Sequence, residues 1–256
     1  MKRRNKLKYI ILIFTLVFTS VSTSNISFSE ELKLCGIDWP PFTYSEKNRI
    51  IKGISFDVYT EAFRRLNVHF TAREIPWPRC LKYVEEGKYD AVIDNGASAS
   101  FLNGMFPTGF YPLAMYVRNN FPQNTFSWKD MKGKSVGMVR GYDYTEKIIN
   151  FEGWVPRFSN TDELLIKKLH EKRYDYVILD IFSAPILSER LGKKIKMLTP
   201  LIDSTNLYLV FNKNNAEIAK EYDKVIGKMI QDGTIDSIYL KYLSKSYTEI
   251  MNMSTN

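Results

Sequence analysis

The chain has 256 residues, of which 45% are hydrophobic and 25% are charged, an ordinary composition for one large globular domain or two small lobes. The formal net charge is +8, but five of the basic residues lie before Glu30, in a segment without acids, so the remainder carries only +3. We therefore expect no nucleic acid among its partners.

The first 29 residues have the layout of a secretory signal peptide. A basic patch from Lys2 to Lys8 precedes an apolar run from Tyr9 to Phe18, and Ser27-Phe28-Ser29 offers a cleavage site between small residues. The apolar run is too short to span a bilayer comfortably, which argues against a membrane anchor. We expect cleavage of this segment and a mature protein located in the periplasm.

The chain has two cysteines, Cys35 and Cys80. Because export places them in an oxidising compartment, we expect a disulfide between them. Two unpaired buried cysteines are the alternative.

The first predicted strand, Leu32 to Ile37, runs into a loop that contains two prolines and therefore forms no regular structure. This loop carries Trp39, Phe42 and Tyr44. The rings either pack the loop against the core or form the wall of a binding cleft. The second interpretation is possible because loops after strands carry ligand contacts in open α/β sheets. Both interpretations stay open for Trp39, and the cleft is favoured for Phe42 and Tyr44.

A helix from Gly53 to Leu66 and a strand from Val68 to Glu74 are predicted next from their apolar spacing. A second rigid loop, from Ile75 to Cys80, leads into a helix from Leu81 to Glu86. It carries two further candidate ligand contacts, Trp77 and Arg79. The helix dipole disfavours a cation such as Arg79 at a helix start, so Arg79 either contacts an anionic group of a ligand or pairs with a nearby acid.

The stretch from Tyr89 to Ile93 reads as a short buried strand that stops at Asp94-Asn95-Gly96. A carboxylate at the end of a buried strand is costly unless the strand exits into a cleft. A second copy of this pattern, Tyr174 to Asp180, also ends in an aspartate. Two such units predict two lobes that face one another across a polar cleft.

The second half alternates strands and helices in the same way, which predicts a mostly parallel sheet in each half. The polar segment from Asn119 to Trp128 reads as a boundary. A strand from Lys134 to Val139 closes with Arg140-Gly141-Tyr142-Asp143 before a helix, a geometry that can bind an anion through backbone N–H groups. Two separate strands, at Ile195 to Leu198 and Leu207 to Phe211, precede helices at the C-terminus, and the last residues are expected to fray.

The sequence has no zinc motif, P-loop, dinucleotide fingerprint or nucleophile elbow. We therefore expect no metal, no cofactor and no enzymatic activity. Asp94 and Asp180 could in principle act as a general acid and base, but paired acids also suit a cation site and nothing supplies a nucleophile. Binding is favoured over catalysis.

The order of these motifs resembles that of family 3 extracellular solute-binding proteins, the periplasmic receptors of polar amino-acid ABC transporters. The motifs are the export signal, the Trp39-Pro40-Pro41-Phe42 loop with Tyr44, the helix with Gly53 and Asp57, the Gly87-to-Asp90 turn and strand, the Gly133-to-Gly137 strand and the strand that ends at Asp180.

The resemblance implies an α/β, two-lobed, type 2 periplasmic binding fold, with a mostly parallel sheet flanked by helices in each lobe. Two crossing strands would join the lobes, near Leu113–Arg118 and Leu207–Phe211. Lobe 1 would comprise residues 30–116 and 208–248, lobe 2 residues 117–207, and residues 249–256 a frayed tail.

The resemblance also implies roles for individual residues. Phe42 and Tyr44 match the aromatic wall of the first lobe, Asp180 the acid that pairs with a ligand ammonium, and Gly141-Tyr142 the turn that faces a ligand carboxylate. Two features depart from the pattern: residues 98–104 lack the arginine that clamps an α-carboxylate, and Asp94 stands where a small neutral residue is usual. The expected ligand shifts toward neutral or cationic, with Arg79 or Arg140 as substitute anion partners.

The sequence thus predicts a monomeric periplasmic protein that captures a small polar solute, an amino acid or a related amine or amide, for an inner-membrane ABC permease. A sensor without transport, or less favoured a dehydratase-like enzyme on the same scaffold, are the alternatives. The candidate ligand contacts are Phe42, Tyr44, Trp77, Arg79, Asp94, Asn95, Gly96, Arg140, Gly141, Tyr142 and Asp180.

Overall fold

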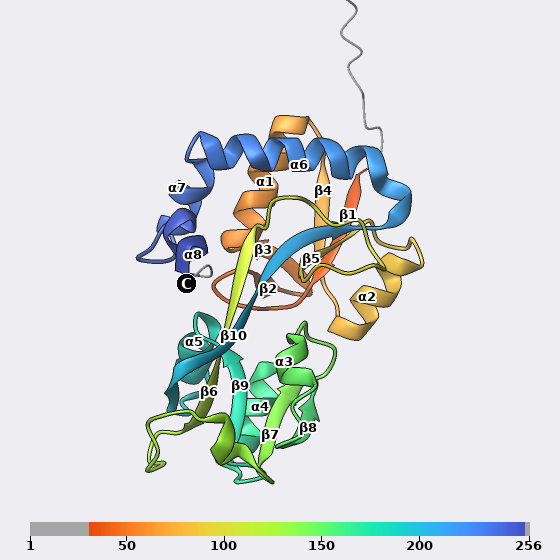
Figure 1. Ribbon diagram of the computed structural model, residues 1–256. Helices are drawn as coiled ribbons and strands as arrows, with labels where there is room; N and C mark the ends of the chain where they lie inside the picture. Colours follow the sequence, from red (N-terminus) through yellow and green to blue (C-terminus); the bar gives the residue numbers. More distant parts are fainter. Residues whose placement is uncertain (1–30, 254–256) are drawn as a thin grey trace, which may run out of the picture.

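The computed structural model describes residues 31–253, so the predicted signal peptide at 1–29 lies outside the described residues. Two bodies, each made of strands flanked by helices, are joined by two long strands (Figure 1). We call the body that contains the first described strand lobe 1 and the other lobe 2. Within residues 31–253, no helix is both long and apolar enough to cross a membrane.

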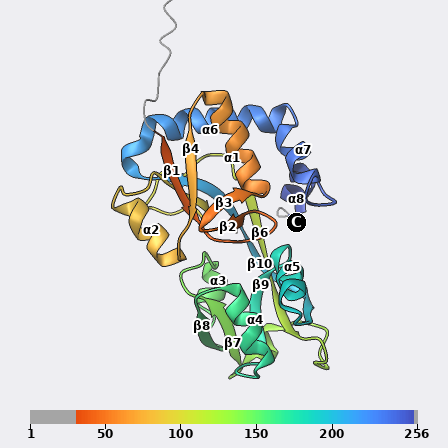
Figure 2. The same cartoon turned by 180° about the vertical axis from the view of Figure 1, so that it is seen from behind.

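Lobe 1 is built from both ends of the described chain. Its elements are β1 (Leu32–Gly36), β2 (Tyr44–Glu46), β3 (Arg49–Lys52), α1 (Ile54–Leu66), β4 (Phe70–Glu74), α2 (Trp77–Glu85), β5 (Ala91–Asn95), α6 (Ala216–Gln231), α7 (Thr234–Leu240) and α8 (Tyr247–Met253), with a short 3-10 turn at Lys213–Asn215. Figures 1 and 2 show α1 and α6 over the end of this lobe that is remote from lobe 2.

Lobe 2 is formed by the middle of the chain. Its elements are a 3-10 turn at Trp128–Met131, β7 (Ser135–Val139), α3 (Glu146–Ile149), β8 (Val155–Ser159), α4 (Asp162–His170), β9 (Tyr176–Asp180) and α5 (Ser183–Leu191). The two long strands, β6 (Gly109–Arg118) and β10 (Ile195–Phe211), run from one lobe into the other in both views (Figures 1 and 2).

The strands form one continuous sheet in the order β2-β3-β4-β1-β5-β10-β6-β9-β7-β8. In lobe 1, β1 pairs in parallel with β4 and β5, and in lobe 2, β7 pairs in parallel with β8 and β9. β5 and β9 are buried along their whole length, as expected for strands covered on both faces. Their C-terminal residues, Asn95 and Asp180, therefore mark equivalent edges of the two lobes.

β10 is one strand of 17 residues, where the sequence predicts two separate strands. The polar residues Asp203 to Asn206 have little strand propensity, so the sequence does not indicate that the two predicted strands are continuous. They nevertheless pair with residues 110–113 of β6, after a register shift between Leu198 and Asp203. Tertiary pairing with β6 thus overrides local propensity, and the antiparallel β6–β10 pair connects the lobes.

Two further elements differ from the prediction. α2 begins at Trp77, four residues earlier than expected, because Pro78 lies in its first turn, where no backbone N–H is needed. The expected frayed tail contains α8, which is held by the Tyr247 hydroxyl donating to the Pro107 carbonyl at 2.8 Å and by the buried Ile250. Residues 254–256 lie outside the described part.

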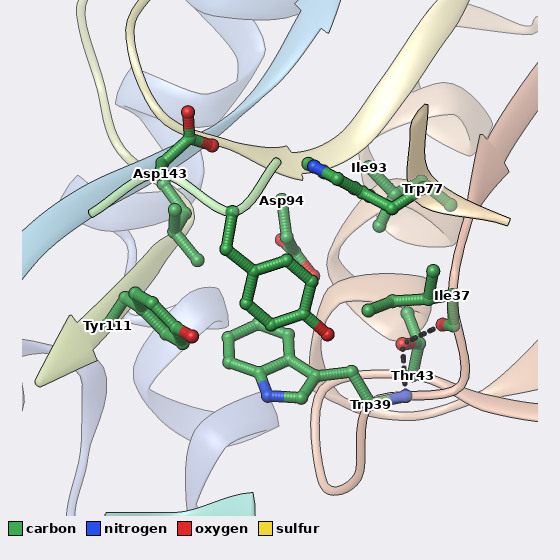
Figure 3. A pocket seen from close by; sticks show the side chains of 10 residues that line it. Ile37, Trp39, Thr43, Trp77, Ile93, Asp94, Tyr111 and Asp143 are labelled. Carbon is green, nitrogen blue, oxygen red and sulfur yellow. Dashed lines mark hydrogen bonds between the residues drawn. The ribbon is translucent and has the colours of Figure 1, made fainter. Parts of the chain in front are cut away.

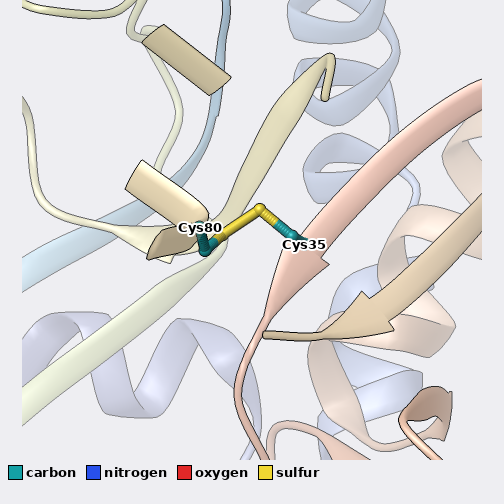
Figure 4. The surroundings of a disulfide bond; sticks show 2 residues. All are labelled: Cys35 and Cys80. Atoms are coloured by element: carbon teal, nitrogen blue, oxygen red, sulfur yellow. A yellow bond between two sulfur atoms is a disulfide. The ribbon is translucent and has the colours of Figure 1, made fainter. Parts of the chain in front are cut away.

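Cys35 and Cys80 form the expected disulfide, with their Cα atoms 5.8 Å apart (Figure 4). The alternative of two unpaired thiols is therefore wrong. The bond joins β1 to α2, and both side chains are fully buried. It fixes α2, and with it Trp77, against the sheet of lobe 1.

Removing this disulfide in the variant Cys35→Ala/Cys80→Ala should lower the free energy of unfolding by about 2–5 kcal/mol. The bond spans 45 residues, and opening it restores conformational freedom to the unfolded chain. Equilibrium urea unfolding measures the change. Val84→Ala, a buried truncation on the same helix that keeps the disulfide, is the control and should cost less. A double variant within 1 kcal/mol of the parent would contradict this estimate.

Candidate functional site

A cavity lies where the two lobes meet, and its walls come from both of them (Figure 3). The lining residues are Ile37, Trp39, Thr43, Trp77, Ile93 and Asp94 from lobe 1, Tyr142 and Asp143 from lobe 2, and Tyr111 and Leu207 from the connecting strands. About 30 Å³ is available to the centre of a water molecule. The cavity is thus small, largely aromatic, and bordered by two carboxylates.

Asp94 is the most unusual residue of this cavity. It lies in β5 with a φ of 55°, the left-handed region that non-glycine residues seldom adopt, and it is 8% exposed. Its Oδ1 accepts a 2.8 Å hydrogen bond from the Tyr59 hydroxyl, whereas its Oδ2 is buried without a hydrogen-bond partner. Burial raises the pKa of Asp94 to about 6, an effect that the nearby hydroxyls of Ser55 and Tyr59 oppose. The Ser55 hydroxyl is itself buried without a hydrogen-bond partner, so Tyr59 is the donor that Asp94 keeps.

Lysine, arginine and histidine are missing from the lining residues of this cavity. Asp143 is the second lining acid, and its Oδ2 accepts a 2.8 Å hydrogen bond from the Gly96 backbone N–H. Burial raises the pKa of Asp143, and this hydrogen bond opposes the shift. A buried carboxylate without a cationic partner favours either its protonated form or a cation bound beside it.

Four hydrogen bonds hold the lobes together around the cavity. The Trp39 indole Nε1 donates to Asp180 Oδ2 at 3.0 Å, and the Trp77 Nε1 donates to the Gly141 carbonyl at 2.7 Å. The Gly96 bond to Asp143 is the third, and the fourth is a charged pair in which Arg190 Nη1 donates to Asp38 Oδ2 at 2.5 Å. Each one joins an element of lobe 1 to an element of lobe 2, so this is a closed arrangement.

Asp180 is satisfied by these contacts. Besides Trp39, it accepts hydrogen bonds from the backbone N–H of Phe182 at 2.9 Å and of Ser183 at 2.8 Å, and from the Ser183 hydroxyl. It is 1% exposed and does not line the cavity, and burial raises its pKa. In this arrangement Asp180 holds Trp39, and the indole ring rather than the carboxylate faces the cavity.

The remaining predicted contacts divide into two groups. Trp77, Asp94 and Tyr142 line the cavity. Gly96 and Gly141 are bonded through their backbone to the lining residues Asp143 and Trp77, and the Asn95 side-chain amide donates to the Gly96 carbonyl. Four others are not among the lining residues: Phe42, Tyr44, Arg79 and Arg140.

Each of those four has another environment. Phe42 is fully buried and stacks on Trp39 with ring centroids 4.3 Å apart, so it supports the indole from behind. Tyr44 lies in β2, with the Lys52 ammonium 4.9 Å from its ring. Arg79 is exposed, and the Arg140 guanidinium is exposed beside the Phe158 ring at 5.5 Å.

The sequence prediction did not single out several lining residues. Asp143 is the last residue of the predicted Arg140-to-Asp143 turn, but it was not named as a ligand contact. Tyr111 and Leu207 lie on β6 and β10, and they reach the cavity only because these strands cross between the lobes. Ile37 and Thr43 lie next to strand ends and Ile93 in the middle of β5, and the sequence carries no specific signal for these apolar or small residues.

The titration of Asp94 predicts how stability depends on pH. Its carboxyl pKa is about 6 in the folded protein against 3.8 ordinarily, so the folded state holds the proton more tightly than the unfolded state. The stabilisation from this group is complete below about pH 4 and is lost as the pH rises through about 6, a change of about 3 kcal/mol. Urea unfolding between pH 4 and 7 measures it.

In Asp94→Asn, this part of the pH dependence should disappear, and the exposed Asp130→Asn serves as the matched control. Buried Asp162, whose pKa burial raises to about 7, continues to contribute in both variants. Identical pH profiles of the free energy of unfolding in the parent and in Asp94→Asn would show that Asp94 does not titrate in this way.

Known proteins resemble this chain along most of its length. The sequence model of the bacterial extracellular solute-binding proteins, family 3, matches residues 34–245. The L-cystine-binding protein TcyA of Bacillus subtilis (strain 168) is 20% identical over 215 residues, which cover 82% of this chain and 80% of the relative. The lysine/arginine/ornithine-binding periplasmic protein of Escherichia coli (strain K12) is 24% identical over 259 residues, covering 92% and 96%.

A solved structure of a mutant ArgBP from T. maritima superposes with a TM-score of 0.73 at 18% identity, covering 84% of this chain and 96% of that one. Such a likeness shows the fold, and it confirms the predicted two-lobed α/β architecture. With a family match over most of the described residues and a cavity between two lobes, the chain belongs to the bacterial extracellular solute-binding proteins of family 3 and has the type 2 periplasmic binding fold.

Proposed function

We propose that this protein captures a small solute bearing an amine in the cavity between its lobes and delivers it to an ABC importer. The cavity that both lobes line, closed by hydrogen bonds from one lobe to the other, carries this proposal. A solute can enter only when these bonds are open, and its contacts with both walls then favour closure.

The charge of the lining favours an amine over an acid. Asp94 and Asp143 border the cavity, and cationic side chains are missing from its lining. The relatives named above carry L-cystine, lysine, arginine and ornithine in their names, and these compounds all contain amino groups. Such a group would supply the positive charge that the lining lacks.

The roles of the individual residues follow from this proposal. Asp94 is the primary partner of the amine, and the rings of Trp39, Trp77, Tyr111 and Tyr142 enclose the solute. Asp180 acts through Trp39, which it holds in the wall. Arg79 and Arg140 have no role in the closed site, because both lie outside the lining.

The same proposal covers the export of the protein, its oligomeric state, its transport partner and its hinge. The segment 1–29 directs export to the periplasm, where the protein acts as a monomer and a binder rather than a catalyst. An inner-membrane permease receives the solute. Residues 30–116 and 208–248 act as one rigid lobe and residues 117–207 as the other, with β6 and β10 as the hinge.

Small-angle scattering combined with a thermal-shift panel tests the proposal. The panel contains amino acids, polyamines, amides and simple ammonium compounds. A solute that raises the melting temperature is expected to leave the protein compact and to shift the population toward the closed form. A protein that no member of the panel stabilises, and that neither opens nor closes in solution, would contradict a receptor function.

The hydrogen bond between Trp39 and Asp180 predicts a specific change in closure. Trp39→Phe keeps an aromatic ring but removes the indole N–H, so one bond between the lobes is lost and Asp180 keeps only its partners in lobe 2. The variant should populate more open forms, with a measurably larger radius of gyration by small-angle scattering.

Trp128→Phe is the control for this variant. Trp128 packs against Trp154 within lobe 2, with ring centroids 5.3 Å apart, and makes no contact across the lobes among those described. An unchanged radius of gyration in Trp39→Phe, equal to that of Trp128→Phe and the parent, would rule out a closing role for the Trp39 indole.

A further inference from the structure

We propose that the cavity is an aromatic cage for a compact organic cation without an α-carboxylate, such as an alkylated ammonium group. This inference rests on the proposed function and names the substrate class of the same site. Three features carry it: the arrangement of four aromatic rings, an unpaired buried carboxylate oxygen, and the internal use of the groups that would hold a ligand carboxylate.

The four rings form successive walls. Trp39 and Tyr111 have centroids 5.5 Å apart and planes at 72°, and Tyr111 and Tyr142 are 6.3 Å apart at 73°. Tyr142 and Trp77 continue the series at 6.1 Å and 77°. At these distances and angles the rings pack edge to face on one another, so a cation would lie against the surface that this array turns to the cavity. The face of an aromatic ring attracts positive charge within about 6 Å of its centroid.

The cage is supported from outside. Phe42 stacks behind Trp39, and the Tyr142 hydroxyl donates to Asp162 Oδ2 at 2.7 Å. The Trp77 and Trp39 indole nitrogens are occupied by Gly141 and Asp180 across the lobes. The polar atoms of Trp39, Trp77 and Tyr142 are thus engaged elsewhere, so these three rings offer apolar aromatic surface rather than hydrogen bonds to the cavity. Alkylated ammonium ions, which lack N–H donors or have few, suit such walls.

Asp94 supplies the negative charge. Its side chain is among those that line the same cavity as Trp39 and Trp77 (Figure 3), and its Oδ2 is buried without a hydrogen-bond partner. A cation in the cage would compensate this carboxylate without requiring a directional hydrogen bond. The pKa of Asp94, raised to about 6 by burial, is what a carboxyl shows when such a counter-charge is missing.

The site lacks the means to hold an α-carboxylate. Residues 98–104 contain no arginine, and basic side chains are missing from the lining. The backbone N–H of Gly96, at the end of β5, donates to the chain's own Asp143 carboxylate at 2.8 Å. A ligand carboxylate would have to displace Asp143 and lie near two acids, at an electrostatic cost.

The size of the cavity points the same way. The 30 Å³ open to the centre of a water molecule corresponds, for a compact shape, to a sphere with a radius of about 3.3 Å. That volume admits a head group of a few heavy atoms. A long chain such as arginine or cystine would have to extend beyond it, into the adjoining hollows that share Asp143, Ile37 and Tyr142 with this cavity.

Isothermal titration calorimetry of the exported protein with tetramethylammonium chloride tests the inference. Sodium chloride at equal ionic strength corrects for salt, and tert-butanol, which is similarly compact but uncharged, tests whether charge matters. We expect saturable binding of tetramethylammonium, at least 10-fold weaker binding of tert-butanol, and no binding of L-arginine or L-cystine at the same concentrations.

Two variants assign the binding to the cage. Asp94→Asn removes the charge and Trp77→Leu removes one wall, and each should weaken tetramethylammonium binding about 10- to 30-fold. Tyr83→Leu, which removes an aromatic ring of the same helix outside the cavity, should leave binding unchanged. Thermal unfolding of each variant checks that it is folded before titration.

The outcomes separate this inference from the proposed function. If L-arginine or L-cystine binds and tetramethylammonium does not, the inference is overturned and the receptor function stands. If tetramethylammonium binds equally to the parent and to folded Asp94→Asn and Trp77→Leu, the cage assignment is wrong. If no solute binds and the lobes do not close with any of them, the proposed function fails as well.

Discussion

The hydrogen bond from the Trp39 indole to Asp180 connects the first loop of one lobe to the end of a buried strand in the other. An indole can donate there because Asp180 already receives two backbone N–H groups and a hydroxyl from the start of α5, which fix its carboxylate in place. The same bond orients the Trp39 ring toward the cavity. This contact therefore contributes both to closure of the lobes, together with the three other bonds between them, and to the shape of the site.

The electrostatics of the site follow from what surrounds the two lining acids. Gly96 satisfies one oxygen of Asp143 and Tyr59 one oxygen of Asp94, but no cation faces either residue within the lining. Leaving Asp94 Oδ2 unpaired is costly in a buried site. A cationic solute bound in the closed form would lower this cost, because its charge would compensate the Asp94 carboxylate.

The sequence predicted the fold well because its signals were local. Apolar strands that end at Asp94 and Asp180, glycine turns and an ordered set of short motifs are enough to indicate two α/β lobes. The site was harder to predict because its walls come from segments far apart in the chain. Tyr111 and Leu207 reach the site because β6 and β10 cross between the lobes. The sequence also could not show that the Trp39 indole donates a hydrogen bond to Asp180, or that Phe42 stacks behind Trp39.

The most direct measurement is the identity of the small molecule that co-purifies with the exported protein. The protein is isolated from its own cells without added ligand, denatured, and the released compound is identified by mass spectrometry, with binding stoichiometry from native mass spectrometry of the intact complex. A compact organic cation without a carboxylate, bound one to one, is the predicted result. An α-amino acid such as arginine or cystine, released in equal stoichiometry, would contradict a cage for carboxylate-free cations.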